Sequence, residues 1–189
     1  MSVEYYKLKE SVDEYIRLAE GFNGDQIIKK LKRFLPAGSY LLEIGSGPGT
    51  DWKNLNQYYE VVGSDYSVEF LKRLKTTHPN ANFIELNATT LKTDKKFTGI
   101  YSNKVLHHLR DEELKISINR QYEILNSDGI ICHSFWKGEG TEVYNGLFVN
   151  YHTDHDIHNF FGDYFEILSI ESYKEFEKDD SIFLIGKKK

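Results

Sequence analysis

Three glycines at alternate positions, Gly45, Gly47 and Gly49, follow a short apolar run that begins at Leu41. Such a run is typical of a buried strand, and residues 51–59 after the glycines have the pattern of a helix. Glycine at a strand-to-helix turn can take a positive φ and lets a ligand approach the backbone closely, while the helix beyond it begins with unpaired N–H groups. Residues 41–50 are therefore predicted to form a ligand-binding loop.

An acidic residue follows at the distance that an adenosine ligand requires. Dinucleotide-binding loops have the form G-x-G-x-x-G, with an acid about 20 positions on that holds the ribose hydroxyls. Here Thr50 stands where the third glycine would be, and Asp65 ends the second predicted strand. A carboxylate there can accept hydrogen bonds from both ribose hydroxyls, and Tyr66 can lie against the adenine. The pattern indicates an adenosine ligand without choosing among the adenosine cofactors.

Histidines supply the other candidate chemistry. His107 and His108 follow the fourth predicted strand, where either could transfer a proton near neutral pH, although they could also be a surface pair at a helix start. His152, His155 and His158 have a spacing that could suit a metal ion, but they fall around a predicted helix start and no clean ligand set accompanies them. We therefore expect no metal site.

The elements that must position these residues alternate between strand and helix, which indicates a parallel sheet with crossover helices. Residues 1–36 are expected to form two helices that act as a lid, and residues 136–151 a loop. A helix capped by Thr153 and a closing antiparallel hairpin should follow. Strands are expected at 40–44, 60–64, 82–86, 98–102, 129–135, 165–173 and 180–186, and helices at 51–59, 67–76, 111–125 and 153–161.

Length and composition indicate one globular domain, residues 1–189, with the lid at 1–36 and the core at 37–189. A net charge of -5 argues against nucleic acid as a partner. The single cysteine, Cys132, fits a reducing cytoplasm, and no signal peptide or membrane-spanning segment is visible. We expect a cytoplasmic monomer or homodimer.

Residues 41–50, Asp65 and the segment 99–109, in this order and at these spacings, resemble the class I S-adenosylmethionine-dependent methyltransferases. The resemblance covers roughly residues 40–187. It implies an α/β fold, a doubly wound three-layer sandwich whose seven-stranded, mostly parallel sheet has an antiparallel last strand, as in other Rossmann-like methyltransferases. It also implies S-adenosyl-L-methionine as the cofactor.

The resemblance assigns a part of the cofactor to each segment. The methionine part would lie on Glu43, Gly45, Ser46, Gly47 and Gly49, with its ammonium on the backbone carbonyls of Ser102 and Asn103. Asp65 would hold the ribose, with Tyr66 beside it, while Asn87 and Ala88 would flank the adenine. Many family members carry aspartate at the Asn87 position, but the asparagine carbonyl can still accept a hydrogen bond from the adenine amino group.

The resulting hypothesis is methyl transfer from S-adenosylmethionine to a small-molecule acceptor, since the regions left for substrate recognition are short. In related enzymes the His107 position tends to face the methyl group, so His107 or His108 is the expected base if the acceptor must lose a proton. Two alternatives stay open: a non-catalytic S-adenosylmethionine-binding module that regulates a partner, and an NAD-linked dehydrogenase. The aromatic residues expected to wall in a substrate are Tyr5, Tyr6, Tyr15, Trp136, Tyr144, Phe148 and Tyr151.

Overall fold

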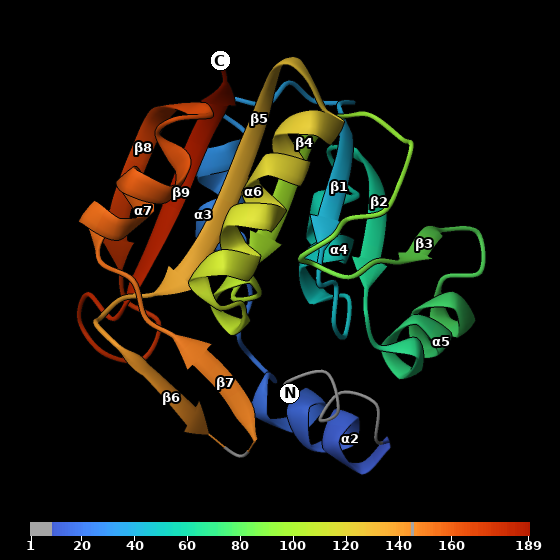
Figure 1. Cartoon of the computed structure of the whole chain (residues 1–189). Coiled ribbons are helices and arrows are strands. Elements are labelled where there is room, and N and C mark those ends of the chain that lie inside the picture. Colours follow the sequence, from blue (N-terminus) through green and yellow to red (C-terminus); the bar gives the residue numbers. More distant parts are fainter. Residues whose placement is uncertain (1–8, 145) are drawn as a thin grey trace.

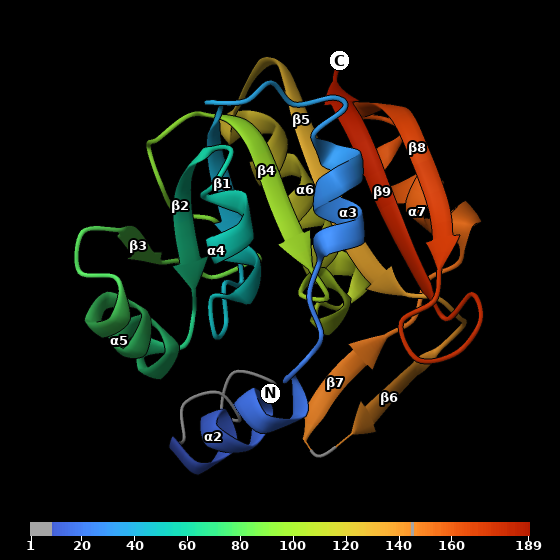
Figure 2. The ribbon, with the colours of Figure 1, turned by 180° about the vertical axis from the view of Figure 1, so that it is seen from behind.

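Seven strands form one sheet in the order β3-β2-β1-β4-β5-β9-β8, with helices on both of its faces (Figures 1 and 2). The computed structural model describes residues 9–144 and 146–189. Strands β1 to β5 all run parallel to one another, whereas β9 is antiparallel to β5 and β8 is antiparallel to β9. The predicted sheet and its closing hairpin are therefore confirmed. The strands are β1 (Tyr40–Ile44), β2 (Glu60–Asp65), β3 (Asn82–Glu85), β4 (Phe97–Asn103), β5 (Leu125–Trp136), β8 (Phe165–Tyr173) and β9 (Ser181–Lys188).

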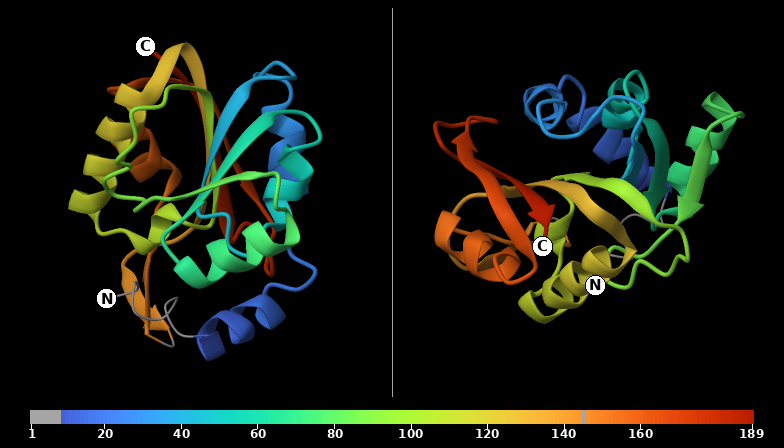
Figure 3. Two further views of the ribbon diagram at one scale, coloured as in Figure 1. Left: turned by 90° about the vertical axis from the view of Figure 1, so that its right-hand side faces the viewer. Right: turned by 90° about the horizontal axis from the view of Figure 1, so that it is seen from above.

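Helices cover the two faces in pairs. In Figure 1, α6 (Asp111–Ile124) and α7 (Asp154–Phe161) lie in front of the sheet. Figure 2 shows α3 (Asp25–Leu31) and α4 (Thr50–Leu55) on the opposite face, while α5 (Val68–Thr77) lies beside the edge strand β3. The two views seen at right angles in Figure 3 show the same layers. Among the described residues, no helix is long and apolar enough to cross a lipid bilayer.

The continuous apolar runs of the central strands follow from this layering. Successive side chains of a strand point to opposite faces, so a strand covered on both faces must be apolar at every position. In β1, Leu42 packs under α6 and α7, whereas its neighbour Leu41 packs under α3 and α4. In β5, Ile131 packs on the same face of the sheet as Leu42, and Cys132 packs on the same face as Leu41.

Two predicted elements differ in the structure. The second N-terminal helix ends at Leu31 rather than near Pro36, and Leu35 instead packs against Gly99 of β4, where a Cβ would lie 2.6 Å from it. The segment 136–151, expected to be a loop, contains the antiparallel strands β6 (Thr141–Tyr144) and β7 (Leu147–Asn150). Every residue of β6 is exposed, so this strand is held by backbone pairing with β7 and not by a buried apolar face. An alternating apolar pattern is therefore not needed in β6, and the sequence gives little indication of the hairpin.

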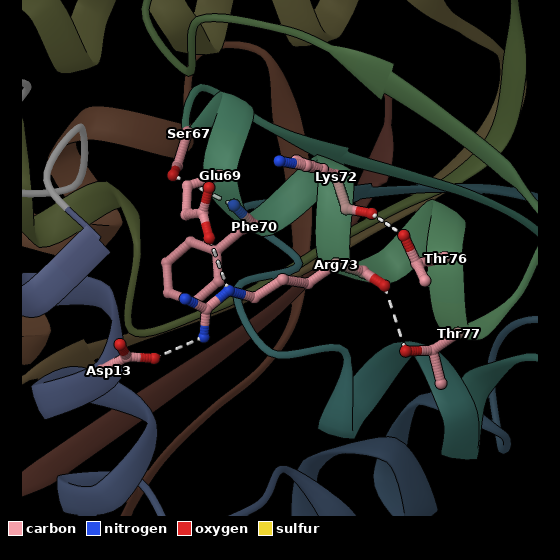
Figure 4. A network of polar contacts seen from close by, with 8 residues as sticks. All are labelled: Asp13, Ser67, Glu69, Phe70, Lys72, Arg73, Thr76 and Thr77. Carbon is pink, nitrogen blue, oxygen red and sulfur yellow. Dashed lines mark hydrogen bonds and ion pairs between the residues drawn. The ribbon is translucent and has the colours of Figure 1, made fainter.

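The first described helix, α2 (Lys9–Leu18), lies with the β6–β7 hairpin beyond the carboxyl ends of the parallel strands (Figures 1 and 3). Arg73 of α5 holds it there, because its guanidinium contacts Asp13 of α2 at 2.7 Å and Glu69 of α5 at 2.9 Å (Figure 4). The rings of Tyr15 and Phe70 meet edge to face beside this ion pair, with centroids 5.8 Å apart.

Replacing Arg73 should loosen α2 without unfolding the core. We expect Arg73→Gln to speed limited proteolysis near Gly21, while the urea midpoint changes little, because exposed ion pairs add little to global stability. The matched control is Lys72→Gln on the same helix, since Lys72 enters this network through its backbone carbonyl (Figure 4). Equal cleavage rates in both variants and the parent would show that the ion pair between Arg73 and Asp13 does not hold α2 in place.

Candidate active site

Two cavities, of about 380 and 340 Å3, open at the carboxyl ends of β1 and β4. These strands are neighbours in the sheet, and ligands of doubly wound folds bind where such neighbours diverge. The first cavity reaches from the end of β2 to His108, and the second from Glu43 to the connection between β8 and β9. The cavities meet at the residues that line both, which are Tyr15, Gly45, Gly47 and Lys104.

The glycine loop is tied to β2 by the carboxylate of Asp65. The backbone N–H groups of Gly47 and Ser67 each donate to it at 2.8 Å. A Cβ on Gly45 would lie 2.5 Å from a methyl group of Val105, so this position requires glycine, while the φ of +48° at Gly47 favours glycine there. A carboxylate offers about four acceptor sites. Capacity therefore remains for ribose hydroxyls in the first cavity, which Asp65 and Tyr66 line.

Asn87 and Ala88 line the first cavity, but the carbonyl oxygen of the Asn87 side chain is already engaged. It accepts hydrogen bonds from the backbone N–H groups of Thr89 at 2.8 Å and Thr90 at 3.2 Å. An adenine amino group would have to compete with this turn for the two lone pairs of the oxygen. The amide nitrogen of Asn87 is the group left to offer an adenine a hydrogen bond.

A chain of hydrogen bonds joins Ala88 to the end of β4 through the core. Ser117 donates to the Ala88 carbonyl at 2.6 Å, and Gln121 donates to Ser117 at 3.1 Å. His133 Nε2 must then donate to Gln121 Oε1 at 2.7 Å, and Ser102 must donate to His133 Nδ1 at 2.8 Å, since a carbonyl oxygen can only accept. Burial lowers the pKa of His133 to about 3, which keeps this single direction of donation.

Glu43 and Ser46 lie at the base of the second cavity, and both are buried. The Ser46 hydroxyl donates to the Glu43 carboxyl at 2.5 Å. Desolvation raises the pKa of Glu43 to about 8, although the Ser46 hydrogen bond opposes the shift. A carboxyl group in this position is protonated at neutral pH in the unliganded protein.

Asp51 at the start of α4 connects three segments around the second cavity, a role that its sequence position does not reveal. Its carboxylate accepts hydrogen bonds from the Gly24 N–H at 2.7 Å, from the Tyr101 hydroxyl at 2.7 Å and from Asn103 Nδ2 at 3.0 Å. Asn103 also accepts a hydrogen bond from Ser134 through its side-chain oxygen. The side chain of Asn103 is therefore fixed, and it lines the second cavity.

Lys104 is the second residue that sequence reasoning missed. It has a φ of +54°, which few residues other than glycine adopt, and it lines both cavities. Its ammonium donates to the Ser181 hydroxyl at 2.6 Å and to the Phe135 carbonyl at 3.2 Å, and it lies 3.3 Å from the centroid of the Trp136 ring. Burial lowers the pKa of Lys104 to about 7.

The two histidines of the predicted catalytic pair differ in position. His107 is buried and lines neither cavity, and its ring centroid lies 4.1 Å from that of His108. Desolvation lowers the pKa of both rings. His108 lines the first cavity and donates from Nδ1 to the Phe148 carbonyl at 2.7 Å. The catalytic roles of both histidines stay predictions. Of the two, only His108 lines a cavity, where a base could reach a bound molecule.

Other predicted site residues also divide between the cavities and the core. Ser102 and Gly49 are buried and line neither cavity, so Ser102 can contribute to the site only through its backbone. Among the predicted aromatic residues, Tyr15 lines both cavities, Trp136 and Tyr144 the second, and Phe148 the first, whereas Tyr151 lines neither. Tyr5 and Tyr6 lie outside the described residues.

The short connection between β8 and β9 also contributes to the second cavity, although its length suggested only a hairpin turn. The Asp180 carboxylate accepts hydrogen bonds from the N–H groups of Glu175, Phe176 and Glu177, each at 2.8 Å. This turn places Glu175 and Phe176 in the cavity wall, where the Phe176 ring lies 4.7 Å from that of Phe22. Within residues 9–144 and 146–189, no group of three or more His, Cys, Asp or Glu side chains could hold a metal ion.

Comparison with known proteins shows a similarity to methyltransferases. A family model described as a methyltransferase domain matches residues 41–129. A search of curated proteins found no match. Solved structures share the fold, among them an S-adenosylmethionine-dependent methyltransferase from Clostridium acetobutylicum, with a TM-score of 0.77, 12% identity and coverage of 93% of this chain and 98% of that one.

Two further structures are similar. One is the 1,6-didemethyltoxoflavin-N1-methyltransferase of Burkholderia thailandensis with 1,6-didemethyltoxoflavin and S-adenosylhomocysteine bound (TM-score 0.78, 16% identity, 93% and 82% of the two chains). The other is a TehB-like methyltransferase from Corynebacterium glutamicum (TM-score 0.75, 17% identity, 96% and 100%). At these identities the likeness establishes the fold, and the three chains match this one over most of its length.

Removing the Asp65 carboxylate should weaken the binding of S-adenosylmethionine. We expect Asp65→Ala to cost about 1 to 3 kcal/mol of binding free energy, because the ribose hydroxyls and the Gly47 N–H lose their acceptor. Isothermal titration calorimetry measures the change. Glu85→Ala is the control, since Glu85 pairs with Asp65 across the sheet but is exposed and lines neither cavity. An unchanged affinity in Asp65→Ala would contradict the assignment of the ribose site.

Glu43 should make the unliganded protein less stable as the pH rises. Its folded-state pKa of about 8 lies above the ordinary value of 4.5, so its contribution to stability is complete below about pH 4.5 and is lost as the pH rises through about 8. We expect Glu43→Gln to flatten the urea-unfolding free energy between these pH values and to be the more stable protein at pH 8. The control is Glu60→Gln, an exposed change on β2. Parallel pH profiles of Glu43→Gln and the parent would show this interpretation of Glu43 to be wrong.

Proposed function

We propose that this chain is a class I S-adenosylmethionine-dependent methyltransferase that transfers the methyl group of S-adenosylmethionine to a small-molecule acceptor. The observation that carries this proposal is the pair of cavities that meet at the glycine loop. The first cavity has the size and polar groups for an adenosine. The second cavity continues past the place proposed for the methionine part of the cofactor into a space lined by aromatic side chains. A cofactor bound across both would present its methyl group to that space.

We place the parts of the cofactor by the groups that suit them. The ribose lies on Asp65, and the adenine lies by Asn87 and Ala88 in the first cavity. The methionine part lies against Glu43, Ser46 and Asn103 in the second cavity. The sulfonium then lies near Gly45 and Lys104, where the cavities join, and the Tyr15 ring can stabilise its charge.

The cofactor supplies an activated methyl group on a good leaving group, so the task of the chain is to align the acceptor and exclude water. The helix α2 and the aromatic side chains around the second cavity suit that task, since they line the cavity on the side where the acceptor would enter. An acceptor that loses a proton also needs a base. His107 and His108 are the bases that the sequence proposes, and of these His108 lines a cavity.

The size of the second cavity, about 340 Å3, supports a small molecule as the acceptor. The Burkholderia enzyme, which matches 93% of this chain, was solved with 1,6-didemethyltoxoflavin bound. A non-catalytic binding module would not require an aromatic space beside the methyl group, so this cavity favours the enzyme over the module. The buried thiol of Cys132 supports the proposed cytoplasmic location, and we keep a monomer or homodimer as the proposed assembly.

The proposal is tested by the acceptor-dependent release of S-adenosylhomocysteine from S-adenosylmethionine across a panel of small metabolites. We expect at least one acceptor class to raise the release well above the rate without acceptor. Tight cofactor binding with no transfer to any class would instead support a regulatory module. Binding of NADH in place of S-adenosylmethionine, followed by cofactor fluorescence, would overturn the cofactor assignment.

A further inference from the structure

The second cavity continues beyond the segments assigned to the methionine. Its outer wall is built from four separate parts of the chain: α2, the linker after it, the β6–β7 hairpin and the β8–β9 connection (Figure 1). The side chains that these parts contribute are large and mostly apolar. They are Leu18, Phe22, Tyr144, Leu147 and Phe176. Such a wall suits an acceptor with an apolar or aromatic body.

Besides Glu43, three side chains that can carry a charge line the second cavity: Asp51, Lys104 and Glu175. The hydrogen bonds of Asp51 hold the walls of the cavity together. The Lys104 ammonium has three N–H donors, and it meets the Ser181 hydroxyl, the Phe135 carbonyl and the face of the Trp136 ring. The Glu175 carboxylate is half-buried and interacts electrostatically with Lys104. The Asp180 turn fixes the backbone of Glu175 and places this residue in the wall of the cavity.

We infer that the acceptor is an amine on an apolar or aromatic body and that the Glu175 carboxylate binds its N–H group. This inference rests on the proposed function and adds the class of the acceptor atom. A carboxylate in a mostly apolar wall can accept a charge-assisted hydrogen bond from an amine. An anionic acceptor such as a carboxylate or a thiolate would instead meet the like charges of Glu175 and Asp51, which line the same cavity.

The reaction balances with the groups present. The nitrogen lone pair of the amine forms the new N–C bond while the C–S bond of the sulfonium breaks, and the proton of the amine passes to the Glu175 carboxylate. The products are the methylated amine, S-adenosylhomocysteine and a protonated Glu175. The amine must be neutral to attack. Desolvation favours the neutral form, as it does for Lys104, whereas the negative charge of Glu175 opposes this shift until the carboxylate takes the proton.

The test compares acceptors that share one body and differ in the reacting group. Phenylethyl compounds with an amine, a hydroxyl, a thiol or a carboxylate are each supplied with S-adenosylmethionine, and S-adenosylhomocysteine release is measured as kcat/KM. We expect the amine to be the best acceptor. Glu175→Gln should lower kcat/KM for the amine about 10- to 100-fold, because a neutral amide gives a weaker hydrogen bond and cannot take the proton.

The matched control is Glu177→Gln, which lies in the same Asp180 turn but does not line the cavity. Calorimetric affinity for S-adenosylmethionine should be unchanged in both variants, which shows that the fold and the cofactor site persist. Faster transfer to the hydroxyl, thiol or carboxylate compound, or equal amine rates in Glu175→Gln and the parent, would overturn this inference alone. If the parent protein transfers a methyl group neither to the four compounds nor to any member of a wider panel, the proposed function is overturned as well.

Discussion

The strands β1 and β4 lie side by side, and the chain leaves them toward opposite faces of the sheet (Figures 1 and 2). After β1 it turns into α4 on one face, and after β4 it continues to α6 on the other. These two connections therefore do not cross the space directly beyond the two carboxyl ends, and a crevice forms there. Both cavities open at this crevice, and their shared lining includes the glycine loop after β1 and Lys104 after β4.

Buried or half-buried carboxylates hold the walls of this crevice in place. Asp65 accepts hydrogen bonds from the glycine loop and from the start of α5, while Asp51 joins the linker after α2 to β4. Asp180 arranges the turn that carries Glu175 and Phe176. In each case a carboxylate accepts several N–H or O–H groups of loops that would otherwise lack partners. These three aspartates therefore satisfy the backbone N–H groups of the loops around the crevice, and two of them, Asp65 and Asp51, also line the cavities.

The sequence was sufficient to predict the sheet, its closing hairpin and several of the segments that line the two cavities, because these depend on local patterns. Apolar runs indicate strands that are buried on both faces, and the spacing from Gly45 to Asp65 reflects one strand–helix–strand unit. Lys104, Glu175 and Phe176 could not be found in this way, because they enter the site through a positive φ at Lys104 and through a turn that Asp180 holds. The β6–β7 hairpin was missed because β6 has no buried face, and Asn87 has its side-chain carbonyl engaged in a turn that its residue type does not reveal.

A crystal structure of the protein with S-adenosylhomocysteine bound would test most directly whether one cofactor spans both cavities. We predict ribose hydroxyls within hydrogen-bonding distance of Asp65, an adenine beside Ala88, and a sulfur atom near Gly45 that faces the aromatic space of the second cavity. A sulfur atom directed away from the second cavity, or an adenosine bound elsewhere than on Asp65, would contradict the account.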